Sequence, residues 1–567
     1  MNDFYILGIN GSHNGGITVA KNDKVVLTLE FERLFNEKNV GLAQYKTIKG
    51  SDIVFMMKYI SKYILNYFGI KKFNKIVALN TGVNFGQGQD QETYIAENYI
   101  PADEYIYGHH HAAHAFNVLY TSPHDKALIV SFDGGGNDGF FNVYLGDKKN
   151  KISDKYDHID LLETVKHPNA GSPHVFLDLG LPYASFGEVL QDIRREGDLS
   201  NGILVYPGKI MGLASYGEVR KEWLDRFIQY YIGNVHQGNS YVDHMKNLFD
   251  DLKIEHNDTL FHNRYEEDRL SGKVAYDIAA TSQKAFEEAF LVFAKPWMER
   301  YNDIPMCLAG GCGLNIILNT RLKEEFGREV FVGPAPSDCG ISTGLCLQEL
   351  KPKIPADITY AGLPLLDPNS VFEHINDHWW FTSHDVDEGD IVDSLAKGEI
   401  IGLIKGNSEH GPRALGNRSI LCNPSIKKMK DILNEKVKNR EFYRPFAPVV
   451  RLEDVSEYFE FEGESRWMTF CPKVRTEWRE KLAAITHVDG TARIQTITRE
   501  QNTFLYDLIS KFKDKTGIGV LLNTSFNIAG KPITNTVKDA MTLFRDTELD
   551  KLIINDIYFK KCQKTLL

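Results

Sequence analysis

Residues 127–146 read ALIVSFDGGGNDGFFNVYLG, two apolar runs on either side of a glycine-rich turn. Short apolar runs bounded by turn residues are typical of buried strands. A similar arrangement opens the chain, where residues 4–9 and 16–20 flank the turn GINGSHNGG. The strand–turn–strand pattern therefore occurs twice, about a hundred residues apart, which suggests an internal duplication in an α/β protein.

The rest of the chain continues this alternation of strands and helices. Apolar runs predict strands, and apolar residues at spacings of three and four predict helices. On these patterns we expect strands at residues 25–31, 75–79, 306–310 and 399–404, and helices at 52–68, 273–294 and 388–397. Pro296 is expected to end the helix 273–294, because proline lacks the amide hydrogen that the next turn needs.

One proline-rich stretch divides the chain. Residues 351–369 contain four prolines and little helical periodicity, which is typical of a linker. A chain of 567 residues is also too long for a single hydrophobic core. We therefore predict one α/β domain over residues 1–355, a linker over 356–375 and a second α/β domain over 376–567.

The composition is that of an ordinary globular protein and disfavours several functions. Hydrophobic residues make up 43% and charged residues 25%, and the formal net charge is −11. This negative balance disfavours a general nucleic-acid binder, which needs surplus lysine and arginine. The sequence shows no basic leader before an apolar segment, no apolar run long enough to span a membrane, and no C-x-x-C pair among its seven cysteines. We expect a cytoplasmic protein that binds neither nucleic acid nor membranes.

The segment YGHHHAAHAF places His110 and His114 four residues apart. On a helix this spacing puts both imidazoles on one face, where they can bind one cation. Asp133 follows an apolar run, so its carboxylate is expected at a strand end, and Asp338 in GPAPSDCG is a candidate for a further ligand. Two imidazoles with carboxylates suit iron, zinc or manganese better than calcium or magnesium. The alternative is that these histidines are ordinary structural residues.

Three glycine-rich turns follow apolar strands, at residues 8–16, 133–139 and 309–315. Small turn residues allow backbone N–H groups to approach phosphate oxygens. None of the turns matches G-x-x-x-x-G-K-[ST] or G-x-G-x-x-G, and each alone could be a tight hairpin turn. Together they resemble the arrangement by which actin, sugar kinases and Hsp70 hold ATP.

Positive charge collects in the second half of the chain. Residues 405–420 and 434–448 together carry, among their basic side chains, Arg413, Arg418, Lys436, Lys438, Arg440 and Arg444. Downstream, HVDGTARIQTI adds Arg493, and NTSFN at 523–527 adds hydroxyl and amide groups. Arginine in fixed surroundings binds phosphate in a bidentate manner, and lysine adds a point charge. An anion pocket is one interpretation, and a solvated charged surface is the other.

Taken together, these stretches resemble the NodU/CmcH-type carbamoyltransferases. The matching segments, in chain order, are His13 in its glycine turn, EFER (30–33), HHHAAHA (109–115), SFDGGG (131–136), GKIMGLASYG (208–217), GGCGLN (310–315), EHGPRALGNRSI (409–420), VKNREFYRPFAP (437–448), HVDGTARIQT (487–496) and NTSFNIAGKPI (523–533). They extend from residue 8 to residue 533 and so cover nearly the whole chain.

The resemblance implies both a fold and a reaction. The fold is an N-terminal domain of the actin/sugar-kinase/Hsp70 (ASKHA) type with duplicated subdomains, followed by a YrdC-like α/β domain. The second domain is expected to make carbamoyl-adenylate from carbamoyl phosphate and ATP, which binds with Mg2+. The first is expected to transfer the carbamoyl group to a hydroxyl of a small molecule, such as a sugar or natural product. A divalent metal assists this transfer and is expected to be Fe2+, with Zn2+ or Mn2+ as alternatives.

The resemblance also implies roles for individual residues. The metal ligands are His110, His114, Asp133 and Asp338. His13 is the general base that acts on the acceptor, and the catalytic cations of the second domain are Arg413, Lys438 and Arg444. Contacts with nucleotide or carbamoyl phosphate are implied for Lys209, Gly310, Gly311, Asn315, Arg418, Arg440, Arg493, Asn523 and Ser525.

The chain departs from the family pattern at two positions. Asn14 follows His13 where the family more often has Asp, so a carboxylate that would orient His13 is missing from that position. His410 stands where an aromatic residue such as Phe is usual, and we expect this change to alter only packing.

Three other functions fit the sequence less well. A tRNA threonylcarbamoyl-type transferase is disfavoured by the negative charge, and a hydrogenase-maturation carbamoyltransferase by the missing C-x-x-C pairs. A non-catalytic nucleotide sensor of the actin/Hsp70 superfamily needs neither the histidine pair nor the basic cluster. We expect residues 150–270 to shape the acceptor site, and a homodimer is expected only from the general prevalence of dimers.

Overall fold

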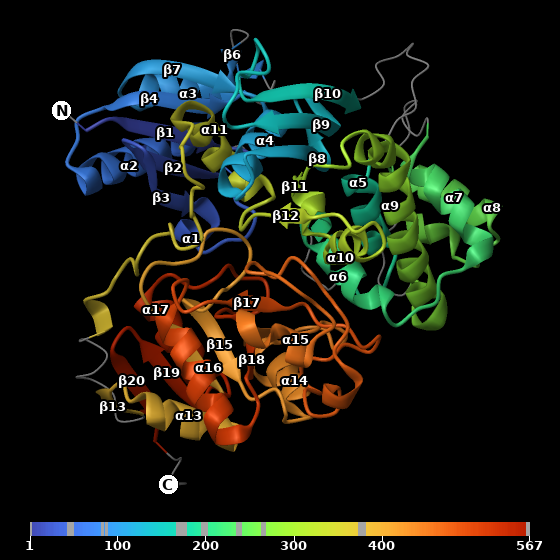
Figure 1. Ribbon diagram of the computed structural model, residues 1–567, viewed down its shortest axis with the longest axis vertical. Helices are drawn as coiled ribbons and strands as arrows, with labels where there is room; N and C mark the ends of the chain where they lie inside the picture. The colour runs from blue at the N-terminus through green and yellow to red at the C-terminus, as the bar shows by residue number, and fades with distance from the viewer. Residues whose placement is uncertain are drawn as a thin grey trace. The chain divides into compact units, whose positions relative to one another are not determined.

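The computed structural model describes residues 3–41, 50–80, 84–85, 89–165, 178–193, 202–233, 241–261, 268–371 and 381–562. The chain forms two compact units, which are coloured by residue number in Figure 1. The first comprises Met1–Thr28 and Asn39–Asp357, and the second comprises Leu29–Lys38 and Ile358–Leu567. The segment Leu29–Lys38, which the predicted boundaries assign to the first domain, therefore packs with the second unit.

The first unit contains two five-stranded sheets of the same design. One consists of β1 (Tyr5–Asn10), β2 (Gly16–Lys21), β3 (Lys24–Glu30), β4 (Phe73–Leu79) and β7 (Ala102–Gly108), in the order β3-β2-β1-β4-β7. The other consists of β8 (Lys126–Gly136), β9 (Gly139–Asp147), β10 (Ile159–Val165), β11 (Met306–Ala309) and β12 (Val330–Val332), in the order β10-β9-β8-β11-β12. In both sheets the central strand is antiparallel to the next strand of the chain and parallel to its other neighbour. The repeated sequence pattern thus corresponds to a repeated topology.

The helices of the first unit fall into two groups. Those beside the sheets are α2 (Gly50–Phe68), α3 (Gln91–Tyr99), α4 (His110–Thr121) and α11 (Ile341–Leu350). A further helical group consists of α5 (Gly180–Ser185), α6 (Gly202–Ala214), α7 (Lys221–Tyr231), α8 (Tyr241–Asp251), α9 (Gly272–Arg300) and α10 (Ile316–Glu324), as Figure 1 shows. Every residue of α4 is buried, and Ala113 of α4 belongs to the same core cluster as Ile341 and Leu345 of α11. This packing fixes α4, which carries the histidine pair.

Pro296 does not end its helix, contrary to the sequence prediction. Helix α9 continues past it to Arg300. Pro296 and Val292 both lie on the exposed side of α9, while Ala294 and Met298 are buried. The carbonyl of Val292, which loses its helical donor, can therefore bond to water instead, and the buried face holds the helix together.

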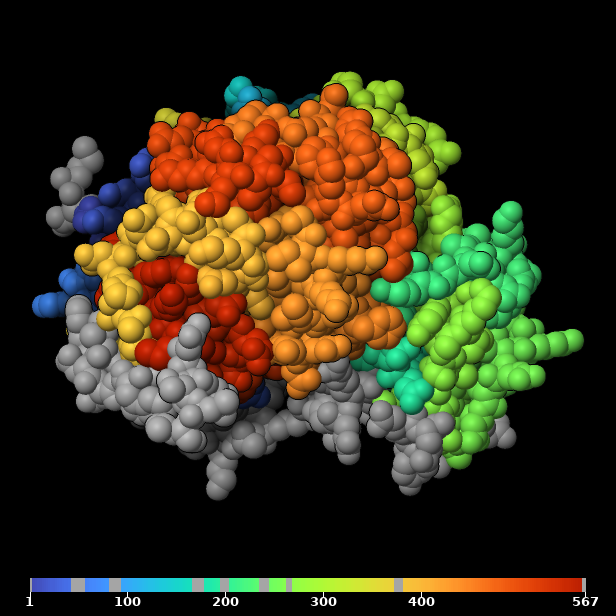
Figure 2. Space-filling view, turned by 90° about the horizontal axis from the view of Figure 1, so that it is seen from below, coloured from blue at the N-terminus to red at the C-terminus, as the bar shows by residue number. Residues whose placement is uncertain are grey.

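The second unit is built on an eight-stranded sheet. Its strands are β13 (Phe381–Asp385), β14 (Ile401–Ile404), β15 (Arg418–Cys422), β16 (Ala447–Arg451), β17 (Gln495–Ile497), β18 (Val520–Ser525), β19 (Lys551–Ile554) and β20 (Ile557–Lys561), in the order β13-β20-β19-β14-β15-β18-β16-β17. Strands from both ends of this unit's sequence are therefore neighbours. Figure 2 shows this as the surface of yellow residues near 380–400 against red residues near the C-terminus.

The helices of the second unit confirm a mixed α/β fold. The longer helices are α13 (Glu388–Lys397), α16 (Thr503–Thr516) and α17 (Val537–Asp546), and the shorter ones are α1 (Phe31–Phe35), α14 (Met429–Ile432) and α15 (Val455–Tyr458). Leu395 of α13 and Leu508 of α16 share a core cluster with Leu403 and Leu521 of the sheet. Among the described residues, no helix is both long enough and apolar enough to cross a membrane.

Candidate metal centre and anion site

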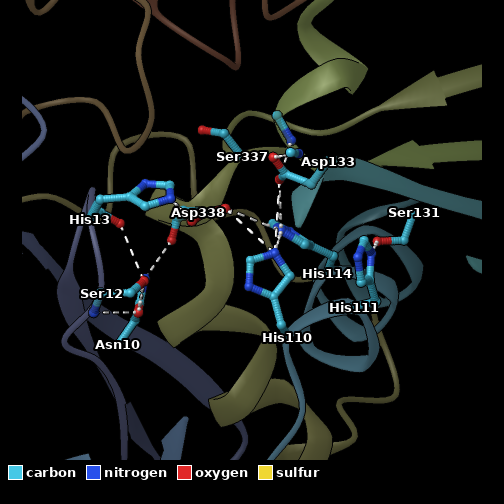
Figure 3. A network of polar contacts seen from close by, with 12 residues as sticks. Asn10, Ser12, His13, His110, His111, His114, Ser131, Asp133, Ser337 and Asp338 are labelled. Carbon is cyan, nitrogen blue, oxygen red and sulfur yellow. Dashed lines mark hydrogen bonds and ion pairs between the residues drawn. The ribbon is translucent and has the colours of Figure 1, made fainter. Parts of the chain in front are cut away.

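Four predicted metal ligands come together in the first unit. His110 and His114 lie on α4, Asp133 lies in β8, and Asp338 begins a short turn before α11. One donor atom from each residue lies within 4.8 Å of those of the others. His114 Nε2 is 3.4 Å from both Asp133 Oδ2 and Asp338 Oδ1, and 3.2 Å from His110 Nε2. Figure 3 shows the four side chains pointing toward one another.

The electrostatics of this cluster favour a cation. Burial lowers the pKa of His114, but hydrogen bonds to the two carboxylates outweigh it and raise the pKa to about 9. Burial raises the pKa of Asp133, but His110 and His114 hold it well below its ordinary value. Each shift reports that the site stabilises positive charge between two carboxylates. Two nitrogen and two oxygen donors in a buried position fit a divalent transition metal.

The glycine-rich hairpin between β8 and β9 holds the helix that carries the histidines. His109 precedes α4 and makes no capping bond with its side chain. Instead, Asp138 accepts hydrogen bonds from the backbone N–H groups of His111 (2.8 Å) and Ala112 (3.2 Å). A Cβ on Gly136 would lie 2.8 Å from the ring of His110, so only glycine allows this close approach. The DGGGNDG segment thus positions the metal ligands in addition to forming a turn.

Asp138→Ala is expected to lower the free energy of unfolding by about 1–2 kcal/mol, because α4 loses its N-terminal cap. Metal affinity should fall by about tenfold, as expected when a group that orients a ligand is lost. Chemical denaturation and metal analysis measure the two effects. Asp138→Asn keeps an acceptor and should be milder. An alanine variant with unchanged stability and metal content would contradict this role.

His111 has a different role from its two neighbours. Its Nε2 lies 2.9 Å from the carbonyl oxygen of Gly139 and therefore donates to it, so Nδ1 accepts from the Ser131 hydroxyl at 2.7 Å. Burial lowers the pKa of His111 to about 4, which keeps the imidazole neutral. In Figure 3 its ring points toward Ser131 and away from the cluster.

His13 lies beside the metal cluster and shares a carboxylate with it. Its Nε2 is 3.2 Å from Asp338 Oδ2, whereas Asp338 Oδ1 faces His114. The carboxylate that we expected to be missing after His13 is thus supplied by a residue more than 300 positions away. Asn14 adopts a left-handed φ of 52°, a conformation that asparagine tolerates well. Asn10 donates to the backbone carbonyl of Asp338 at 2.9 Å and so fixes this partner.

The residues of the first unit that are predicted to contact nucleotide each have different partners in the structure. Gly311 donates to Asp133 Oδ2 at 2.6 Å, and Gly310 donates to the carbonyl of Pro336. Asn315 caps α10 through the N–H of Leu318, and its side chain also bonds to Gln283. Lys209 is buried and donates to the carbonyl of Ile193 at 2.7 Å. The turn at 310–315 therefore adjoins the metal cluster, while Lys209 holds a different loop.

The second unit contains a cluster of basic residues. Burial and the nearby charges of Arg440, Lys38 and Arg444 lower the pKa of Lys438 well below its ordinary value of 10.5. Burial and the same kind of repulsion lower the pKa of Arg440 and of Arg493. The positive charges that act on one another in this way belong to Lys38, Arg413, Lys438, Arg440, Arg444 and Arg493, which we call the basic cluster. Such a site strongly favours an anionic ligand, because an anion relieves the repulsion.

Fixed surroundings hold several of these cations. Arg440 donates to Asn434 Oδ1 at 2.7 Å, and its guanidinium lies 4.1 Å from the centre of the Phe446 ring. Lys438 ends a π-helical turn, a feature often found at functional sites. Its Nζ contacts Ser525, the last residue of β18, and lies 2.7 Å from Asn527 Oδ1. Lys436, in contrast, is exposed.

Two residues predicted to bind the ligand make hydrogen bonds to backbone carbonyl groups within the second unit. Arg418 is fully buried and donates to the carbonyl oxygens of Lys405, Gly406 and Asn417. Asn523 is also fully buried and donates to the carbonyl of Ala414. The sequence cannot distinguish these residues from Arg413, because the difference lies in the direction of the side chains after the loop has folded.

Three functional candidates in the segment Leu29–Lys38 escape sequence reasoning. Lys38 joins the basic cluster, and Glu30 and Arg33 contact the loop that begins at Glu409. His410 Nδ1 lies 3.2 Å from Glu30 Oε1, so the expectation that His410 alters only packing is wrong. The EFER motif is part of the family resemblance, but its place near the N-terminus does not indicate that Glu30 and Arg33 contact Gly411.

Comparison with known proteins identifies two family models that match most of both sites. The model described as Carbamoyltransferase N-terminus matches residues 98–347, and the model described as Carbamoyltransferase C-terminus matches residues 392–561. The nodulation protein NolO of Bradyrhizobium diazoefficiens is 31% identical over 477 residues, which cover 80% of this chain and 78% of NolO. The 3'-hydroxymethylcephem-O-carbamoyltransferase of Streptomyces clavuligerus is 29% identical over 493 residues, which cover 85% of each chain.

A search of solved structures finds weaker likenesses. Full-length HypF in its phosphate- and nucleotide-bound form is 16% identical and matches with a TM-score of 0.33, over 61% of this chain and 46% of HypF. A score this low does not define the fold. The four-residue metal cluster falls in the first matched range and Arg413–Arg493 in the second, whereas His13 and Lys38 precede both.

Proposed function

Because this chain belongs to the carbamoyltransferase family, we propose that it is an ATP-dependent O-carbamoyltransferase that divides its chemistry between its two units. One observation carries this proposal: the chain has two polar sites of opposite character. The first unit has a cluster of two histidines and two aspartates, and the second has a basic cluster centred on Lys438 and Arg444. One suits a cation and the other suits phosphates.

The basic cluster is proposed to bind carbamoyl phosphate and ATP, the latter with Mg2+. The phosphoryl group of carbamoyl phosphate leaves with water as inorganic phosphate. An oxygen of the remaining carbamate then bonds to the α-phosphorus of ATP, the bond to the β-phosphate breaks, and pyrophosphate leaves. The product is carbamoyl-adenylate. Arg413, Arg444 and Arg493 would neutralise the charge that develops on the phosphate oxygens, and Ser525 would donate a hydrogen bond.

The cluster in the first unit is proposed to hold a divalent metal through His110, His114, Asp133 and Asp338. Fe2+ is favoured by the family resemblance, and Zn2+ or Mn2+ fit the same donors. The metal, when bound, supplies a Lewis acid that polarises a carbonyl or phosphoryl oxygen. We further propose that the fold of this unit is of the ASKHA type and that its glycine turns contact the adenylate.

His13 is proposed to accept the proton of the acceptor hydroxyl. Asp338 Oδ2 beside Nε2 favours the tautomer with its proton on Nε2. The lone pair then lies on Nδ1, a buried atom that has no hydrogen-bond partner among the described residues. The hydroxyl oxygen attacks the carbamoyl carbon, AMP leaves, and the proton passes to Nδ1. The acceptor is a small molecule with a free hydroxyl, such as a sugar or a natural product.

Pyrophosphate release from ATP tests this proposal. The protein should release pyrophosphate only when carbamoyl phosphate is present, and no acceptor should be needed. A coupled pyrophosphate assay with carbamoyl phosphate, without it, and with inorganic phosphate in its place measures this dependence. Release that is independent of carbamoyl phosphate, or formation of ADP in place of pyrophosphate, would refute carbamoyl-adenylate formation.

A further inference from the structure

We infer that two buried carboxylates, Glu409 and Glu30, are positioning residues that hold the backbone on both sides of Arg413. The inference deepens the proposed function, because it rests on Arg413 as a contact for the anionic substrate. Arg413 lies in a loop, residues 409–417, that leads into β15 and contains neither helix nor strand. Such a loop needs other contacts to hold a side chain in one place.

Glu409 shapes the second half of this loop. The residue is fully buried, and its Oε1 accepts hydrogen bonds from the backbone N–H groups of Leu415 (2.7 Å), Asn417 (2.8 Å) and Arg418 (3.1 Å). Three amides therefore converge on one oxygen, and the chain curls around the carboxylate. Hydrogen bonds to a charged acceptor are about twice as strong as neutral ones, so this contact is a firm anchor.

Glu30 fixes the first half of the loop from a distant part of the sequence. Its Oε1 accepts from the N–H of Gly411 at 2.7 Å, and Arg33 donates to the carbonyl of the same residue at 2.7 Å. Gly411 has a φ of 103°, a left-handed conformation that favours glycine. The backbone N–H and C=O groups of Gly411 are thus both held, two residues before Arg413.

The negative charges of Glu409 and Glu30 interact with buried guanidinium groups. Burial lowers the pKa of Arg418 to about 10, and the negative charge of Glu409 opposes this shift. Glu30 lies 3.5 Å from Arg33. Glu30 is thus paired with a buried guanidinium, and the charge of Glu409 acts on a second one. Burial lowers the pKa of Arg493, and the nearby charge of Arg413 lowers it further. Both anchors thus act on the backbone of the loop, and Arg413 is one of the charges of the basic cluster.

Glu409→Ala is expected to lower kcat/KM for carbamoyl phosphate in pyrophosphate release by about 100-fold, because a misplacement of about 1 Å can cost this much. The key test is a double variant. If Glu409 acts through Arg413, then adding Glu409→Ala to Arg413→Ala should cause little further loss. If the activity of the double variant fell by the product of the two single-variant losses, the inference would be overturned.

Conservative variants guard against a mere loss of folding. Glu409→Gln and Glu30→Gln keep an oxygen acceptor and should retain activity within about tenfold of wild type, well above the alanine variant. Asp454→Ala is the matched control, because Asp454 is another buried carboxylate of this unit and pairs with Arg451 and Lys513. It should lower the melting temperature but leave kcat/KM unchanged. An equal loss of activity in Asp454→Ala and Glu409→Ala at equal stability would overturn the inference.

Binding of inorganic pyrophosphate, measured by calorimetry, separates this inference from the proposed reaction. Arg413→Ala and Glu409→Ala should weaken pyrophosphate binding to the same extent, even if carbamoyl phosphate does not support turnover. Tight binding by Glu409→Ala would overturn the inference alone. Absence of carbamoyl-phosphate-dependent release with normal binding would overturn the proposed function alone. No binding to the wild-type protein would overturn both.

Discussion

His114→Ala is expected to abolish carbamoyl transfer while carbamoyl-phosphate-dependent pyrophosphate release continues near the wild-type rate. His114 is fully buried and lies within 3.4 Å of both carboxylates of the cluster. Loss of a group that only orients a ligand costs about 10- to 100-fold in metal affinity, so loss of a ligand should cost at least about 100-fold. Metal analysis after anaerobic purification measures the loss of bound metal. Mass spectrometry of a panel of sugars and polyols measures carbamoyl transfer.

The matched control is His111→Gln. His111 is equally buried on the same helix but bonds to Ser131 and Gly139 in place of the cluster. This variant should lower stability yet retain the metal and the transfer reaction. The proposed division between the two units would be wrong if His114→Ala lost pyrophosphate release in parallel with transfer.

Arg444→Ala is expected to reduce pyrophosphate release by about 1,000-fold, the lower range for an arginine that stabilises phosphoryl transfer. Arg444 contributes to the repulsion that lowers the pKa of Lys438, Arg440 and Arg493, so it lies where their positive potentials overlap. Its side chain is partly exposed and pairs with Glu441 at 3.5 Å. Arg444→Lys should recover only part of the activity, because lysine keeps the charge and loses bidentate contact.

Lys436→Ala provides the control for Arg444. Lys436 belongs to the same basic stretch of sequence, but its side chain is exposed. Its removal should change the rate by less than about twofold, since charges in contact with water are well screened. The metal content of Arg444→Ala should equal that of wild type. A variant that loses metal, or that keeps pyrophosphate release, would contradict the role of Arg444.

Local sequence determined the elements of this protein well. Apolar runs gave the strands β1, β4 and β8, and the three- and four-residue spacing gave α2 and α13, because these patterns depend on neighbours in the chain. The four-residue spacing of His110 and His114 likewise needs only a helix to bring two imidazoles together. Asp338 was already a candidate ligand from its own segment, and the family resemblance added the carbamoyl chemistry, which no periodicity contains.

Tertiary structure decided which side chains share a site. Arg413 and Arg418 stand in one motif, yet one joins the basic cluster and the other is buried among carbonyl oxygens. Leu29–Lys38 lies near the start of the sequence, yet it belongs to the second unit and brings Glu30 to the Arg413 loop. The carboxylate beside His13 comes from Asp338 and not from position 14. The last two outcomes depend on contacts between residues hundreds of positions apart, and the first depends on the direction that each side chain takes after the loop has folded. Local sequence patterns carry no information about either.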